Sequence, residues 1–147
     1  MRVLIKFDNI EKIIPDSINI AYATLSIFTF DEYITPGSMN PTVLGGIKEV
    51  YRITKGWDAS SVTWHDPWDN DGCDFDEEII ASNTNDQKQV WEDFDVSELI
   101  EYYIDNPDSN YGFLVTFPDD PTIDFGGVAY SSEYSDISKR PKLTVYY

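Results

Sequence analysis

The stretch Ile20-Ala-Tyr-Ala-Thr-Leu-Ser-Ile-Phe-Thr-Phe30 decides the fold class of this 147-residue chain. Alanine, leucine and isoleucine alternate in it with threonine, serine and aromatic residues, and this period of two is the one that a β-strand imposes on its faces. The aromatic and β-branched content is typical of a strand that is covered in part on both sides. We therefore predict a long strand over residues 20–30.

The same alternation recurs along most of the chain. Residues 2–8 place Val3, Ile5 and Phe7 on one face and Lys6 and Asp8 on the other, as expected of a strand with one solvated face. Polar turns with proline, asparagine and glycine separate such segments. Further strands are predicted at 46–54, 62–64, 78–82, 87–94, 111–117, 123–130 and 142–147.

The period changes once, late in the chain. Apolar residues recur there at the spacing of an amphipathic helix, at Val96, Leu99, Ile100, Tyr103 and Ile104. Asp95 and Glu98 have the form of a capping box, and the proline at position 107 ends the pattern. We predict one short helix at about residues 96–105. Short, regularly spaced strands with a single helix predict an all-β, antiparallel, jelly-roll-like β-sandwich that fills residues 1–147 as one domain.

The charge balance excludes two classes of partner. Twenty-seven acidic residues face ten lysines and arginines, for a net charge of -17. Such a chain repels phosphate backbones and anionic lipids, so neither nucleic acid nor a membrane surface is expected to bind it. No apolar stretch approaches the roughly 20 residues of a membrane helix. Lys6 and Asp8 interrupt the N-terminal apolar run, so no signal peptide is predicted.

The residues that most often serve catalysis are scarce. His65 is the single histidine and Cys73 the single cysteine, and no nucleophile-elbow motif accompanies them. A loop histidine between Trp64 and Asp66 is the simpler interpretation, and an acidic surrounding is expected to raise the pKa of the thiol. Because carboxylates occur mostly in solvated loops, a glycosidase pair is not indicated either. We expect no enzymatic activity.

An acidic loop is the one candidate metal site of note. Its oxygen-rich side chains fit calcium, although the spacing does not match an EF-hand, and a hydrated acidic loop is the alternative. A weaker candidate comprises Asp119, Asp120 and Asp124. No cofactor is required, and calcium is the only one considered. Its candidate ligands are Asp66, Asp69, Asp71, Asp74 and Asp76.

Aromatic side chains are the other candidate site, because they provide stacking platforms for sugar rings. Trp68 lies between proline and aspartate and is predicted to be exposed, so Trp68 and Tyr134 are the candidate glycan-binding residues. Trp57, Trp64 and Trp91 are predicted to pack in the core.

Taken in order, a set of fragments resembles the DNRLRE domain family over nearly the whole chain. The resemblance implies a non-catalytic β-sandwich of the kind found in bacterial and archaeal surface proteins, in virus structural proteins and in modules classed as carbohydrate-binding. The fragments are Arg2–Asp8, Ile20–Ser26, Val50–Thr54 with Trp57, Val62–Trp64, Phe94–Ser97, Asn110–Leu114, Ser132–Glu133 and Arg140–Tyr146.

This chain departs from the family pattern at its start, where family members carry a further strand and a glycine-rich turn. We therefore expect an open sheet edge at Val3, Ile5 and Phe7, which favours strand pairing with a neighbouring chain. The expected function is that of a structural or attachment subunit of a virion (capsid or tail) or cell-surface structure. Its partners are protein subunits, further copies of itself or a glycan, and its expected location is a virion, the exterior or the cell surface. The alternative is a carbohydrate-binding module of an extracellular polysaccharide-active protein.

Overall fold

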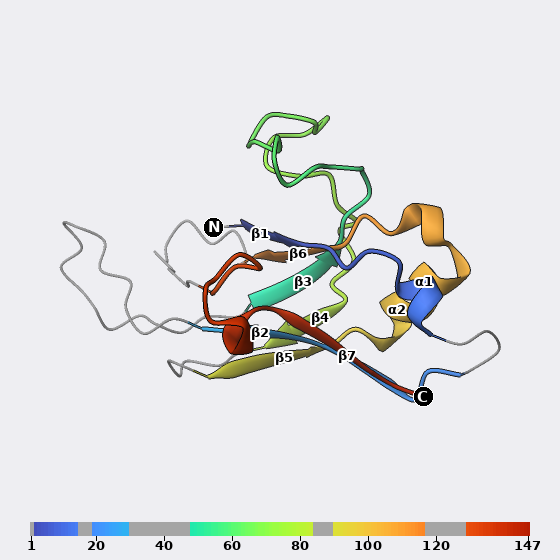
Figure 1. Ribbon diagram of the computed structural model, residues 1–147. Coiled ribbons are helices and arrows are strands. Elements are labelled where there is room, and N and C mark those ends of the chain that lie inside the picture. Colours follow the sequence, from blue (N-terminus) through green and yellow to red (C-terminus); the bar gives the residue numbers. More distant parts are fainter. Residues whose placement is uncertain (1, 15–18, 30–47, 84–89, 117–128) are drawn as a thin grey trace.

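The computed structural model describes residues 2–14, 19–29, 48–83, 90–116 and 129–147. Most regular structure consists of strands in two antiparallel sheets, which confirms the all-β class (Figure 1). The first sheet has the order β1 (Arg2–Ile5), β6 (Phe113–Thr116), β3 (Lys48–Arg52) and β4 (Ala81–Asn83). The second has the order β5 (Trp91–Asp95), β2 (Tyr22–Phe28) and β7 (Lys142–Tyr146).

The predicted strand at 20–30 is β2, the middle strand of the second sheet. Ala23, Leu25 and Ile27 are buried on its inner side, and Thr24 and Ser26 are buried on its outer side as well. The expectation that both faces are covered is therefore confirmed. Because β2 is bonded on both edges, by β5 and by β7, it holds its sheet together.

One hydrophobic cluster draws on both sheets. Val50 and Val115 enter it from the first sheet, and Leu25 and Phe94 enter it from the second. The helix α2 (Ser97–Asp105) adds Leu99, Ile100 and Tyr103, which repeat at helical spacing and are buried. Removing these side chains from water is the main stabilising contribution. Figure 1 shows α1 and α2 together at one end of the sheets.

The predicted helix at 96–105 is confirmed as α2, but the predicted capping box is wrong. Asp95 does not bond the backbone N–H of Glu98, as a capping box requires. Its carboxylate instead accepts hydrogen bonds from the backbone N–H of Ser97 at 3.0 Å and from the Ser97 hydroxyl at 2.6 Å. The Ser97 hydroxyl in turn accepts from the backbone N–H of Ala23 at 2.9 Å. The start of the helix is thus tied to β2, a long-range contact that no local motif reveals.

Three other short helices were not predicted: α1 (Ile10–Ile13) and the 3₁₀ turns η1 (Pro107–Ser109) and η2 (Ile137–Lys139). None of the helices in the described ranges is long and apolar enough to cross a membrane. The strand predicted at 62–64 is wrong, because the hydroxyl of Thr63 accepts from the N–H groups of His65 and Asp66 and closes a turn. The strand predicted at 123–130 lies outside the described residues except for its last two positions.

Gly112 is the residue at which three elements meet. Its backbone has φ +89°, and its carbonyl accepts from the N–H of Ile53 at 3.1 Å and from the hydroxyl of Tyr103 at 2.7 Å. A Cβ atom at this position would lie 2.3 Å from the carbonyl oxygen of Ile5 in β1. Glycine is therefore required both by the backbone conformation and by the close approach of β1.

Gly112→Ala is expected to lower the free energy of unfolding by at least about 2 kcal/mol, since it combines a disfavoured φ with a backbone clash. Urea denaturation measures the loss. Gly56→Ala is the matched control, because its Cβ would make an ordinary 3.5 Å contact with the Tyr111 ring, and it is expected to change stability by less than about 0.5 kcal/mol. Equal losses in the two variants would contradict the proposed role of Gly112.

Candidate functional site

β1 lies at the end of its sheet, as the sequence predicted. It pairs with β6 on one side, and no described strand pairs with its other side. Ile5 is buried in the core, whereas Val3 and Phe7 are half-buried beside it. The three residues predicted as an assembly edge therefore anchor β1 through one face, and the backbone supplies the open edge.

The hydrogen-bond pattern of β6 shows which of its residues bond to β1. The N–H of Ile53 donates to the carbonyl of Gly112, so these two form a hydrogen-bonded pair in the β3–β6 ladder. Hydrogen-bonded and non-hydrogen-bonded pairs alternate in an antiparallel ladder. Leu114 therefore bonds toward β3, and Phe113 and Val115 bond toward β1.

The same alternation assigns the free groups of β1. Ile5 and Val3 lie opposite the two β6 residues that bond toward β1, so their N–H and C=O groups are used within the sheet. The N–H and C=O groups of Arg2 and Leu4 consequently point to the open edge. These are the groups that an added strand would bond.

A groove of about 840 Å³ runs along this edge and is lined by residues 2–8. Trp57 and Val62 form one wall of the groove. They lie on the face of β1 that carries the Leu4 side chain, and Leu4 packs with them. The other wall combines the apolar Ala129 and Pro141 with the hydroxyl-bearing Tyr130, Ser131 and Ser132, and Ala129 borders the core on the face of Val3. The open edge therefore lies between a mostly apolar wall and a mixed one, contributed by distant parts of the chain.

Charges are unevenly distributed along the groove. At one end the guanidinium of Arg2 stacks over the rings of Trp64, at 5.2 Å, and Phe75, at 5.4 Å. At the other end lie Asp8 and Asp58. Hydrogen bonds from the hydroxyl and the backbone N–H of Ser60 hold the pKa of Asp58 below its ordinary value, so that carboxylate is ionised. This end favours a cation.

The acidic loop does not gather its predicted calcium ligands. Asp69 pairs with Lys55 at 2.7 Å and Asp76 with Arg52 at 2.8 Å. In the part of the chain that the structure describes, no group of three histidine, cysteine, aspartate or glutamate side chains is placed to hold a metal ion. Among the remaining candidates, Asp71 contacts His65, Asp74 accepts from the N–H groups of Asp69 and Asn70, and the N–H of Asp66 donates to Thr63.

His65 and Cys73 lie in different surroundings. The side chain of His65 is exposed, and its Nδ1 lies 2.9 Å from the carboxylate of Asp71. Cys73 is buried, and this burial, more than the neighbouring Asp74, raises the pKa of its thiol to about 11. A thiol with that pKa is protonated at neutral pH and is a poor nucleophile.

The prediction that Trp68 is exposed is wrong. Its side chain is only 8% exposed, it packs with Ile53 and Cys73, and its indole N–H donates to the carbonyl of Thr63 at 3.0 Å. That partner allows the ring to be buried. Trp64, predicted to be in the core, is instead 54% exposed. The half-buried Trp57 packs against the same cluster as Trp68 and donates to the carbonyl of Tyr111.

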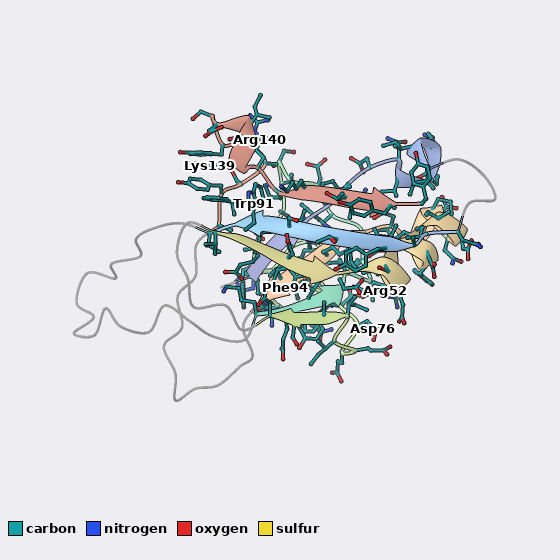
Figure 2. All side chains as sticks on the ribbon, turned by 90° about the horizontal axis from the view of Figure 1, so that it is seen from below. Arg52, Asp76, Trp91, Phe94, Lys139 and Arg140 are labelled. Atoms are coloured by element: carbon teal, nitrogen blue, oxygen red, sulfur yellow. The ribbon has the colours of Figure 1, made fainter. Side chains whose placement is uncertain are left out.

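Tyr134, the second candidate for glycan binding, belongs to an aromatic cluster at one end of the second sheet. Its ring lies 3.9 Å from that of Tyr130, and Trp91 lies edge-on to Phe28 at 5.2 Å. Lysine and arginine side chains lie close to these rings, and Figure 2 shows Lys139, Arg140 and Trp91 in one region of the molecule. The ammonium of Lys139 lies 5.6 Å from the Phe28 ring, that of Lys142 lies 3.7 Å from the Trp91 ring, and Arg140 donates to the carbonyl of Tyr134.

A buried ion pair, which sequence reasoning missed, joins the two sheets. The ammonium of Lys48 on β3 lies 2.8 Å from the carboxylate of Glu92 on β5, whose side chain is 1% exposed. Burial raises the pKa of Glu92, and the bond from Lys48 opposes that shift. Glu92 alternates with the apolar Phe94 along β5, so the period of the strand places the Glu92 side chain on the inner face. This alternation is the sequence feature that could have revealed a buried charge.

Comparison of the sequence with protein-family models and with curated proteins found no match. The resemblance to the DNRLRE domain therefore stays a prediction, and the geometry of the described residues supplies the argument for function.

Lys48→Met is expected to lower the free energy of unfolding at pH 7 by roughly 3 kcal/mol, because it leaves a buried carboxylate without its cation. The folded-state pKa of Glu92 then lies above its ordinary 4.5, so the folded state retains a proton that the unfolded state releases. The free energy of unfolding of Lys48→Met therefore falls as pH rises from the unfolded-state pKa of Glu92 through its folded-state pKa. It recovers as pH falls through the same range.

Urea denaturation at pH 7 and pH 5 measures this dependence. Lys55→Met, which removes the surface pair with Asp69, is the control, and its effect should stay below about 1 kcal/mol at both values. A Lys48→Met deficit of the same size at both pH values would contradict the assignment.

Proposed function

We propose that the protein is a non-catalytic structural or attachment subunit that joins a larger assembly, such as a virion or a cell-surface structure. The observation that carries this proposal is the one-sided pairing of β1 beside a groove. In this proposal the two sheets form a jelly-roll-like β-sandwich, which the shared hydrophobic cluster supports.

An open strand edge is a template for another chain. Proteins that avoid pairing protect such edges with short strands, charged side chains, proline, bulges or a covering element. The strand β1 is four residues long and begins with Arg2, but it contains no proline and its two central residues are apolar. Strand addition supplies affinity through main-chain hydrogen bonds and needs no catalytic group. These properties support attachment as the role of the edge.

The net charge of -17 supports the same role. A strongly acidic chain stays soluble before it is incorporated, and its field accelerates encounter with a basic surface. Two copies repel each other at long range. We therefore place the attachment contact between this chain and a neighbour that carries basic groups near the groove.

The assembly is tested by producing the chain with the proteins encoded beside it and measuring complex size by sedimentation. Leu4→Pro is expected to abolish incorporation, because it removes the N–H that points to the open edge, while edge positions otherwise tolerate proline. Leu4→Ala is the matched control, since it shortens the same side chain but keeps that N–H, and it is expected to enter the complex.

Both variants are first shown to be folded by circular dichroism. Incorporation of Leu4→Pro at the wild-type level would exclude attachment through β1. Failure of the wild-type chain to form any species larger than a monomer, alone or with those proteins, would exclude the assembly role itself.

The second candidate is a carbohydrate-binding module, and the cluster around Trp91 and Tyr134 favours it. Ring faces and flanking cations are groups that recognise sugars, acidic ones in particular. Lys139, Arg140 and Lys142 are three of the ten basic residues in the chain and lie together here.

A glycan array with and without calcium is the test of this candidate. Binding is expected to be roughly five- to thirtyfold weaker in Trp91→Ala and Tyr134→Ala, because each loses a ring contact of about 1–2 kcal/mol. Trp64→Ala removes an exposed indole that is not part of this aromatic cluster, so this variant should bind the glycan normally. An array without signal in either condition would eliminate this function.

A further inference from the structure

The groove beside β1 points to a particular kind of partner. Resting on the proposed attachment role, we propose that its occupant is a single extended peptide segment of another polypeptide. This segment is predominantly apolar, carries basic residues at one end, and adds to the first sheet as a strand.

The backbone of β1 sets the spacing of the contact. The outward N–H and C=O groups belong to Arg2 and Leu4, two residues apart, which is the interval at which an added strand offers its own groups. The strand β1 covers residues 2–5, a length of roughly 13 Å at about 3.3 Å per residue, and the groove continues along residues 6–8. A segment of six to eight residues fits this groove, with about four of them paired to β1 and the others beside residues 6–8.

The residues that line the groove determine which side chains the bound segment can carry. Alternate side chains of an added strand would face the Leu4 side, where Trp57 and Val62 lie, and the Val3 side, where Ala129 and Pro141 lie. A strand covered on both faces is rich in apolar residues, and Tyr130, Ser131 and Ser132 on the Val3 side also offer hydroxyl groups to small polar residues. The favoured occupant is therefore a predominantly apolar segment of valine, isoleucine or alanine that tolerates a small polar residue on the Val3 side.

The same walls argue against a second folded copy as the occupant. A second copy would bring β1 together with the side chains and loops of its own groove, and both sets of walls would compete for the space beside the edge. Each copy also carries a net charge of -17, which opposes close approach. A lone extended segment meets neither obstacle.

The charges at the two ends of the groove determine which end of the segment carries its basic residues. Asp8 and Asp58 lie at the end where residues 2–8 finish, and the cation of Arg2 lies at the end where they begin. Basic residues of the segment are therefore placed beside Asp8 and Asp58. Lys6, which lies 2.9 Å from Asp8, reduces this preference but does not cancel two carboxylates.

The test uses two synthetic peptides, acetyl-Ser-Val-Ile-Val-Ala-Val-Lys-Lys-amide and acetyl-Lys-Lys-Val-Ile-Val-Ala-Val-Ser-amide, with the full-length protein. We expect one of them to bind, the first if the strand runs parallel to β1 and the second if it runs antiparallel. Replacing the lysines by glutamates is expected to weaken binding at least about tenfold at low salt. Replacing the central valine or alanine by proline, or Leu4→Pro in the protein, should abolish it, whereas Leu4→Ala should still bind.

Amide hydrogen exchange of the labelled protein identifies the groups that bond. On peptide binding the N–H of Leu4 should gain protection, while the N–H groups of Val3 and Ile5, already bonded to β6, should change little. Absence of binding by both peptides would overturn the inference, as would equal protection at all three positions.

The result separates this inference from the proposed function. If the chain assembles in a manner that Leu4→Pro abolishes, yet neither peptide binds or competes, the occupant is a folded sheet edge and the inference alone fails. If a peptide binds with the expected protection but no assembly forms, the groove assignment stands and the assembly role fails.

Discussion

The close approach of β1 to Gly112 is the constraint on which the rest of the described structure depends. No side chain fits between the two, since a Cβ would lie 2.3 Å from the carbonyl oxygen of Ile5. The same residue accepts hydrogen bonds from Tyr103 of α2 and from Ile53 at the end of β3. One glycine thus fixes the position of an edge strand, a helix and a central strand relative to one another.

The open edge follows from this arrangement. Once the backbone at Gly112 sets which groups of β6 face β3, alternation leaves Val3 and Ile5 bonded inside the sheet and Leu4 turned outward. No strand within the described ranges bonds this edge, and a groove with one mostly apolar and one mixed wall runs beside it. Proposals for attachment and for an extended apolar partner both start from this backbone geometry.

Electrostatics separates the acidic surface from the interior. The candidate calcium ligands Asp69 and Asp76 form ion pairs with Lys55 and Arg52, and calcium binding by the loop stays a prediction. Inside the protein, Lys48 and Glu92 link the two sheets as a buried ion pair. Removing one partner of such a pair strongly lowers the free energy of unfolding. Near Trp91, the ammonium groups of Lys139 and Lys142 lie over ring faces, and the net charge of the chain is -17.

The sequence by itself determined the all-β class, the long strand that became β2 and the helix that became α2. Periodicity carries those features, because each depends on neighbours a few residues apart. Tertiary structure decided the rest. Trp68 is buried and Trp64 exposed because a carbonyl of Thr63 happens to lie within reach of one indole, and the aspartates of the acidic loop meet partners from other elements. The groove joins residues 2–8, 57–62 and 129–141, and contacts between segments so far apart arise only when the sheets have packed.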